Sequence, residues 1–390
     1  MTQTIELEDI GEVMESSDGM EDFLTDFFGD KSLRWYQRAA INQGAQALED
    51  GIRRILIKLP TGAGKTLCIA AAMSDPQIRR ALKIPASRPI RVLFVAHKHR
   101  LLSQAENTFI DDSNVTLILQ SMFSAIPDYV LQQGWDICIL DEAHHEACST
   151  FQYQLERIGD QVIIGLTATD SRADGCLIKF DEIIEPISRE QAVHEGWLAP
   201  TRIHSFVDVT SKDKINILTD VFTNYAHEMN QTMVFVKTKK EVVAVTILLR
   251  SLGYKVVGLL AQSEKELNNI LDRFSAGEIQ FIVNCNRISE GVDVIGCTDV
   301  VLGRQFGSYA QLNQVIGRAA RPDSDCNVWE LVNPLSGTNL DTTTIVGTPE
   351  YHRLVNKQGP NWIERIFDYV THRTNKQLGI ASGIRISHQH

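Results

Sequence analysis

Short apolar runs alternate with segments of helical period along most of this chain. Five runs in the first half are apolar on both faces, as the strands of a buried parallel sheet are. They cover residues 53–59, 90–96, 115–119, 135–140 and 161–166. Residues 66–74 and 100–109 between them have helical spacing. Strands that alternate with helices predict a doubly wound α/β domain.

A second series of the same kind follows. Its predicted strands are residues 232–236, 255–260, 279–284, 299–303 and 328–332, and its predicted helices are residues 239–252, 264–275 and 309–320. Gly196 and Pro200 interrupt the pattern between the two series. We therefore predict a first domain over residues 31–197 and a second over residues 198–340, both α/β. A tail over residues 341–390 follows, with a short helical stretch around 350–378.

The charge is unevenly distributed. The chain of 390 residues has a net charge of −11, yet residues 1–30 contain ten Asp or Glu residues and no Lys or Arg. The remainder is nearly neutral and can still carry a basic groove, so the negative total does not exclude nucleic acid. The acidic extension has two interpretations: a solubilising or partner-binding arm, or a mimic of nucleic acid that restrains the protein.

The lengths of the apolar runs and the positions of the cysteines predict the cellular compartment of the protein. No run reaches the ~18–20 apolar residues of a membrane span, and the acidic N-terminus has no feature of a signal peptide. The seven cysteines are scattered and contain no CxxC pair, which favours a reducing environment. We predict a cytoplasmic protein, of a bacterium or a phage-infected cell, that is a monomer without membrane contact.

The segment "LPTGAGKT" (59–66) follows a predicted strand and opens a predicted helix. That context is typical of a phosphate-binding loop, whose backbone amides point at phosphate oxygens. Lys65 can reach the β- and γ-phosphates, and the Thr66 hydroxyl can bind Mg²⁺. The candidate ATP contacts here are Pro60, Thr61, Gly62, Ala63, Gly64, Lys65 and Thr66.

The segment "CILDEAHH" (138–145) ends another predicted strand. Carboxylates at the carboxyl end of a parallel strand lie where such sheets bind ligands. Asp141 can hold Mg²⁺, and Glu142 can act as the general base toward an attacking water. An acidic helix start would give the same letters, but the phosphate loop upstream favours the catalytic interpretation.

With these two motifs the chain resembles the superfamily 2 helicases of the DEAH type. It is most similar to the DNA-acting branch with restriction-enzyme translocating subunits, RadD-like proteins and phage UvsW-like helicases. "LRWYQRAA" (33–40) resembles the adenine-sensing motif, which implies that Gln37 reads the adenine edge and that Arg34 lies near the base. The other matching segments are "VAHKHRLLSQ" (95–104), "LQSM" (119–122), "LTATDSR" (166–172, with Asp170 where the family usually has Pro), "VFVKTKKEV" (234–242), "VNCNRISEGVDV" (283–294) and "QVIGRAAR" (314–321).

The resemblance implies two tandem RecA-like domains that share one ATP site. Gln314, Arg318 and Arg321 have the spacing of one helix face, and the family places these residues against the γ-phosphate. Alone, two arginines on a helix would more simply be surface residues. Gly291 and Asp293 are implied at the nucleotide site from the second domain, and His144, Thr167 and Thr169 couple that site to the bound strand.

The same likeness implies contacts to nucleic acid, chiefly to backbone phosphates. The candidates are His97, Arg100, Gln120, Ser121, Thr238, Lys239, Arg287 and Ser289. An ordinary polar loop is an equally good explanation for each of them individually.

The function that these patterns favour is an ATP-dependent DNA helicase or translocase that uses Mg²⁺ and acts on forked or branched DNA. Two alternatives stay open: an RNA helicase, and an ATP-gated nucleic-acid-binding subunit that does not unwind. The amino-acid sequences of the segments at 234–242 and 283–294 resemble those of DNA-acting helicases more than those of RNA helicases.

Overall fold

The computed structural model describes two compact units, which we treat separately. The first comprises residues 1–59, 64–167 and 178–187, and the second comprises residues 60–63, 168–177 and 188 onward. The described residues are 27–28, 31–85, 87–96, 105–106, 108–109, 114–121, 124, 126–143, 161–168, 180–207, 214–285, 294–306, 309–320, 325–332, 342, 346, 349–358 and 361–368. Among them, no helix is both long and apolar enough to span a bilayer.

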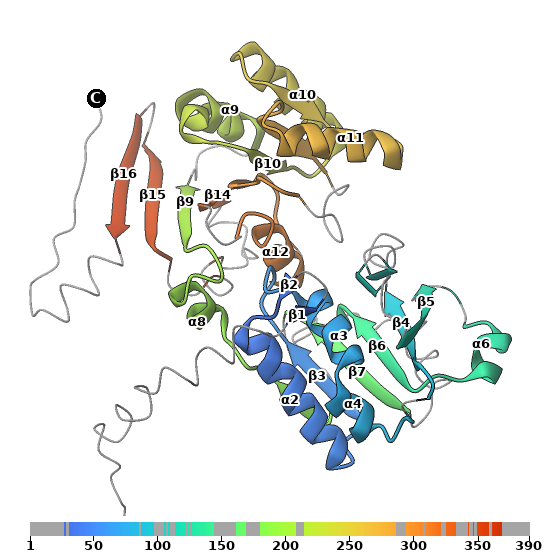
Figure 1. Ribbon diagram of the computed structural model, residues 1–390. Helices are drawn as coiled ribbons and strands as arrows, with labels where there is room; N and C mark the ends of the chain where they lie inside the picture. Colours follow the sequence, from blue (N-terminus) through green and yellow to red (C-terminus); the bar gives the residue numbers. More distant parts are fainter. Residues whose placement is uncertain are drawn as a thin grey trace, which may run out of the picture. The chain divides into compact units, whose positions relative to one another are not determined.

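The first unit is a six-stranded sheet with the order β5-β4-β6-β7-β3-β8, in which every pairing is parallel. Helices α2, α3 and α4 lie together beside it (Figure 1). A two-stranded hairpin, β1 with β2, precedes α2. The bounds are β1 Phe27–Phe28, β2 Lys31–Ser32, α2 Trp35–Glu49, β3 Arg54–Lys58, α3 Lys65–Ser74, α4 Pro76–Ala81, β4 Ile90–Ala96, β5 Val115–Ser121, α6 Asp128–Gln133, β6 Ile137–Asp141, β7 Val162–Thr167 and β8 Glu182–Ile184.

The centre of this sheet explains the continuous apolar runs. Every residue of β6 and of β7 is buried, because both strands have neighbours on each side and are covered on each face. All five strands predicted in this half are present, whereas the short β8 was missed.

The second unit is an eight-stranded sheet with the order β11-β12-β10-β13-β14-β9-β15-β16. All pairings are parallel except the last, β15 with β16. The bounds are α8 Arg189–His194, β9 Thr201–Val207, α9 Lys214–Tyr225, the 3₁₀ helix η4 Ala226–Glu228, β10 Thr232–Phe235, α10 Lys239–Ser251, β11 Val256–Gly258, α11 Glu264–Ser275, β12 Phe281–Asn284, β13 Asp299–Leu302, α12 Tyr309–Ile316, β14 Cys326–Val332, β15 Tyr351–Gln358 and β16 Asn361–Asp368.

Consecutive residues of β10 serve two different cores. Met233 and Phe235 pack into one apolar cluster, while Val234 and Val236 pack into the other. Since successive strand side chains point to opposite faces, the sheet is buried on both sides. The start of α10 is set locally: Thr238 Oγ1 accepts from Glu241 N at 3.2 Å, and Glu241 Oε2 accepts from Thr238 N, which is a capping box.

The prediction of a helical tail around 350–378 is wrong over the residues described. Residues 351–368 form the hairpin β15–β16 at the edge of the second sheet (Figure 1). Charged residues of this hairpin are held in ion pairs: Arg353 pairs with Glu228 at 2.6 Å and with Glu364 at 2.7 Å, and Lys357 pairs with Asp220 at 2.5 Å. The second sheet therefore continues past residue 340.

His204 lies in this core, where it is 3% exposed. Its ring stacks on Trp329 at 3.8 Å, and the hydroxyl of Tyr351 is 3.4 Å from its Nδ1. Burial lowers the pKa of His204 to about 3, and the nearby positive charges of Arg353 and Arg202 act in the same direction. His204 is therefore neutral in the folded protein across the physiological range.

This histidine should make stability depend on pH. The unfolded side chain titrates near pH 6.5, so between about pH 6.5 and 3 the unfolded state holds the extra proton. Stability should then fall as the pH falls, by up to about 1.4 kcal/mol per pH unit from this group. His204→Phe should show a shallower decline than wild type in urea unfolding between pH 7 and 4.5. His194→Gln, at an exposed position, is the matched control. An unchanged slope in His204→Phe would contradict the assignment.

Candidate nucleotide-binding site

The loop between β3 and α3 is held in a tight, defined conformation. Leu59 N donates to Thr167 O of the neighbouring β7 at 3.0 Å, and Ala63 N donates to Pro60 O at 3.0 Å. The backbone angle φ is 89° at Gly62 and 80° at Gly64, values that residues with a Cβ rarely adopt. Gly64 is also the N-cap of α3, so the loop leads directly into the positive end of a helix.

Lys65, the first residue of α3, folds back over this loop. Its Nζ donates to the carbonyl oxygen of Leu59 at 3.3 Å. The ammonium group thus lies above the loop, where a bound phosphate would meet it. Thr61 Oγ1 is buried and has no hydrogen-bond partner in the part of the chain that the structure describes. A buried hydroxyl of this kind fits a ligand oxygen, because an unsatisfied buried polar group is otherwise costly.

Gln37 connects helix α2 to the loop. It is 2% exposed, its Oε1 accepts from Arg34 N at 2.9 Å, and its Nε2 donates to Gly64 O at 3.3 Å. A Cβ at Gly64 would lie 2.6 Å from Gln37 Nε2, so a larger residue would displace this amide, and the φ of 80° would strain it as well. The structure therefore gives Gln37 a role in positioning the loop, and adenine recognition by Gln37 and Arg34 stays a prediction.

Cys68 Sγ lies 3.6 Å from the carbonyl oxygen of Gln37 on the inner side of α3. Burial raises the pKa of this thiol to about 12. It therefore stays protonated and acts as packing, not as a nucleophile.

Asp141 is the last residue of β6, two strands from β3 in the sheet, and Glu142 follows it. Asp141 is 6% exposed, and its Oδ1 accepts from Glu142 N at 3.0 Å. Glu142 has φ of 53°, in the left-handed region that non-glycine residues seldom occupy. Strain of this kind is concentrated at functional positions, and here it turns the Glu142 side chain away from the course of the strand.

These features share one edge of the sheet. The phosphate loop follows β3, Asp141 ends β6, and Thr167, fully buried, ends the intervening β7. The carboxyl ends of parallel strands form the ligand-binding edge of such sheets. A carboxylate and a hydroxyl, from Asp141 and Thr66, are oxygen donors of the type that Mg²⁺ prefers. The donor set and the orphaned Thr61 hydroxyl thus fit a magnesium-bound nucleoside triphosphate.

Gln314 lies in the second unit, on α12. It is 5% exposed, and neither its Oε1 nor its Nε2 has a hydrogen-bond partner among the described residues. A buried carboxamide with both ends unsatisfied fits a residue reserved for a ligand.

The prediction that Gln314 and Arg318 share one helix is wrong in detail, because α12 ends at Ile316. Gly317 N still donates to the carbonyl four residues back, Asn313 O, at 2.8 Å, whereas Arg318 N donates to Val315 O at 3.2 Å, three residues back. Glycine weakens a helix, and the final turn tightens into a 3₁₀ pattern. Arg318 therefore lies in the loop that follows α12, and its side chain is partly exposed.

The described candidates for nucleic-acid contact differ in what their side chains do. Gln120 is 7% exposed, and its Nε2 donates to the carbonyl oxygens of Ser121 and Ser124, each at 2.9 Å, so it braces the turn after β5. Thr238 caps α10, and Lys239 is the exposed first residue of that helix. Lys239 is the best placed of these for a phosphate.

Several predicted site residues lie outside the described residues: His97, Arg100, His144, Thr169, Arg287, Ser289, Gly291, Asp293 and Arg321. Their roles stay predictions. The contact that sequence reasoning missed is the Leu59 carbonyl that holds Lys65. Every residue has such a carbonyl, so the sequence carries no signal for it.

Two family models match the chain. The model for "Type III restriction enzyme, res subunit" matches residues 30–118, and the model for "Helicase conserved C-terminal domain" matches residues 213–323. The first range contains the phosphate loop, and the second contains Gln314 and Arg318. The chain belongs to the superfamily 2 helicases.

Individual relatives agree with this placement. A protein of Saccharomyces cerevisiae described as the ATP-dependent helicase IRC3 is 22% identical over 371 residues, which are 81% of this chain and 53% of that protein. The chain thus spans about half the length of the yeast protein.

Two solved structures share the fold. A fragment described as an HsdR subunit of a type I restriction enzyme from Vibrio vulnificus has a TM-score of 0.65 at 23% identity, over 87% of this chain and 71% of that one. The ATP-dependent Type ISP restriction-modification enzyme LlaBIII, bound to DNA, has a TM-score of 0.61 at 15% identity, over 79% of this chain and 28% of that one. The predicted fold class, two tandem RecA-like domains, is confirmed.

Proposed function

We propose that this superfamily 2 helicase is a DNA-dependent ATPase that converts hydrolysis into movement along DNA. The observation that supports it most is the single sheet edge that holds the phosphate loop, Asp141 and Glu142. Binding, metal and base chemistry for phosphoryl transfer are then available at the ends of neighbouring strands.

Each residue of that edge has a chemical task in this proposal. The amides around Gly62 and Gly64 bind phosphate oxygens, and Lys65 exchanges the Leu59 carbonyl for the β- and γ-phosphates. Thr66 and Asp141 would hold Mg²⁺, and a metal ion there would supply positive charge to the phosphates of bound ATP. Glu142 accepts the proton of the attacking water, which leaves hydroxide character on the oxygen that attacks phosphorus.

In the same proposal, residues of the second unit supply positive charge to the phosphoryl group that is transferred. Gln314, Arg318 and Arg321 stabilise the transferring phosphoryl group, and an arginine in this role is worth roughly 10³–10⁵-fold in other phosphate-transferring proteins. The orphaned carboxamide of Gln314 supports this part of the proposal. Gly291 and Asp293 act at the same site, while His144, Thr167 and Thr169 transmit its state to the bound strand. Release of the γ-phosphate then ends the contacts that favour one arrangement of the domains.

We infer that the strand is DNA. The likeness to restriction-enzyme subunits, one of them solved with DNA, supports this choice. His97, Arg100, Gln120, Ser121, Thr238, Lys239, Arg287 and Ser289 are the proposed contacts. Forked or branched DNA is the proposed substrate, the acidic N-terminus is a proposed arm for a protein partner, and the proposed working form is a monomer.

A substrate panel tests the function. ATPase stimulation should be strong with single-stranded or forked DNA and weak with RNA of the same sequence. Strand displacement should occur on forks, three-way junctions and four-way junctions. Stronger stimulation by RNA would replace DNA with RNA in the proposal. Stimulated ATPase without strand displacement or movement would instead identify an ATP-gated clamp.

A further inference from the structure

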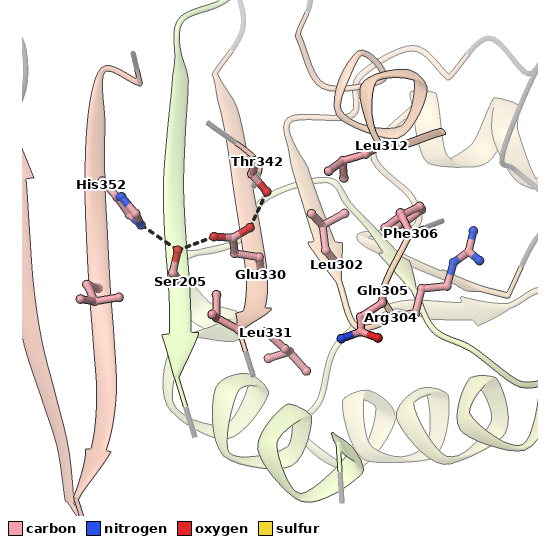
Figure 2. A pocket seen from close by; sticks show the side chains of 12 residues that line it. Ser205, Leu302, Arg304, Gln305, Phe306, Leu312, Glu330, Leu331, Thr342 and His352 are labelled. Carbon is pink, nitrogen blue, oxygen red and sulfur yellow. Dashed lines mark hydrogen bonds between the residues drawn. The ribbon is translucent and has the colours of Figure 1, made fainter. Parts of the chain in front are cut away.

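A pocket of about 310 Å³ lies in the second unit, and none of the residues assigned to ATP is among those that line it. It is formed by the carboxyl halves of β13, β14 and β9, by β15, and by α12, which contributes Leu312 (Figure 2). Its volume is at the lower end of the range for small-molecule sites, about 300–1,000 Å³. Six of its twelve lining residues are apolar: Leu302, Phe306, Leu312, Leu331, Val332 and Leu354.

A chain of hydrogen bonds crosses one wall of this pocket (Figure 2). Ser205 Oγ donates to Glu330 Oε1 at 2.5 Å, Thr342 Oγ1 donates to Glu330 Oε2, and His352 Nε2 lies 2.7 Å from Ser205 Oγ. An ionised carboxylate only accepts, so the single proton of Ser205 goes to Glu330, and His352 Nε2 must donate. The result is a half-buried carboxylate held in one orientation by hydroxyls from two segments.

This arrangement is not a hydrolytic triad. In a triad the histidine lies between the serine and the acid and takes the serine proton. Here the serine lies between the histidine and the acid, and its proton is directed at Glu330. The group is therefore suited to accepting hydrogen bonds from a ligand, with Glu330 as the acceptor.

A positively charged side chain, that of Arg304, also lines the pocket. Arg304 follows β13, its guanidinium carbon is 4.4 Å from the centre of the Phe306 ring, and its Nε has no hydrogen-bond partner in the described part of the chain. A partly buried guanidinium with an unsatisfied Nε is matched by a phosphate, which accepts from a planar fork of N–H groups. The pocket thus combines a phosphate-type donor, apolar walls and a carboxylate acceptor.

The pocket also lies at the edge of the sheet where we propose strand contacts. β13 pairs in parallel with β10, and Thr238 and Lys239 begin the helix that follows β10. Arg304 follows β13 in the same way. Since parallel strands end at one edge, Lys239 and Arg304 both follow strands that end at this edge of the sheet.

We propose that this pocket receives one unstacked base of a bound DNA strand. Glu330 accepts hydrogen bonds from the amino edge of the base, the apolar wall covers its rings, and Arg304 binds the adjoining phosphate. The inference rests on the proposed function and adds to it, since phosphate contacts alone carry no base preference. Cytosine offers an exocyclic amino group to a carboxylate, whereas thymine offers none.

The test measures affinity for three single strands of equal length: oligo-dC, oligo-dT and an abasic strand. Wild type should bind oligo-dC roughly tenfold more tightly than the abasic strand, in line with the worth of one held base. Oligo-dT should fall between them. Glu330→Gln should lose the preference for dC over dT, because the amide replaces one acceptor with a donor, and should bind the abasic strand as wild type does. Leu354→Trp, which fills the pocket, should bind all three strands alike.

The control is Glu278→Gln, which removes an exposed carboxylate elsewhere in the second unit and should keep the wild-type order. Equal affinity of wild type for all three strands, with ATPase stimulated by each, would overturn the pocket and leave the proposed function standing. Absence of any binding or stimulation would remove both. A base that is part of a bound strand has a higher effective concentration at the pocket than free dCMP, so added dCMP should leave the dC preference intact. Loss of that preference would reassign the pocket to free nucleotides.

Discussion

Replacing Lys65 with alanine should lower the ATPase turnover number by roughly 10²–10³-fold, the usual cost of removing one preorganised donor to developing charge. Lys65 is already held over the loop by the Leu59 carbonyl, so it needs little rearrangement to meet a phosphate. Alanine suits the helix start and removes the ammonium group together with the methylene groups that carry it. The turnover should be measured by phosphate release at saturating DNA.

Lys58→Ala is the matched control for that experiment. Lys58 ends β3, just before the loop, and pairs with Glu185 at 3.0 Å on the surface of the first unit. A surface ion pair of this kind contributes little to stability, about 0–1 kcal/mol. The control should retain most of the wild-type turnover. Normal hydrolysis by Lys65→Ala would contradict the proposed site, and equal loss in both variants would indicate a general defect of the loop.

Replacing Glu142 with glutamine should lower the turnover by roughly 10²–10⁴-fold, as loss of a general base does. ATP affinity should change little, because the phosphate contacts come from the loop and from Lys65. Glutamine keeps the length of the side chain and the hydrogen bond from its backbone N to Asp141. Fluorescent-nucleotide binding and phosphate release, measured on the same preparation, separate the two effects.

Glu49→Gln, on the exposed side of α2, is the control for Glu142→Gln and should behave as wild type. A variant that loses ATP binding and hydrolysis together would show that Glu142 holds the loop, not the water. Unimpaired hydrolysis would move the general base to another residue.

The two variants probe different consequences of the same sheet edge. Lys65 depends on local chain geometry: a strand, a turn with two glycines in left-handed conformation, and a helix. Glu142 depends on the pairing of β6 with β7 and of β7 with β3, which brings segments some 75 residues apart to one edge. That pairing converts two separate motifs into one candidate site.

The sequence predicted most of the parallel core because the code for it is local and redundant. All ten expected strands are present, and α11 has the predicted bounds, since Ser263 and Glu266 form a capping box at its start. The predictions were wrong where local pattern and tertiary context disagree. Gly317 tightens the end of α12, and residues 351–368, predicted to be helical, pair as strands.

The sequence by itself determined the chemistry of the phosphate loop and of the segment that ends in Asp141 and Glu142. Each of these is a continuous stretch whose glycines, charges and flanking apolar residues specify strand, turn and helix together. Only the tertiary structure decided what Ser205, Glu330 and His352 do. The serine is 125 residues from the glutamate and 147 from the histidine along the chain. Their contact exists because β9 lies between β14 and β15, a pairing of distant strands that no local pattern encodes.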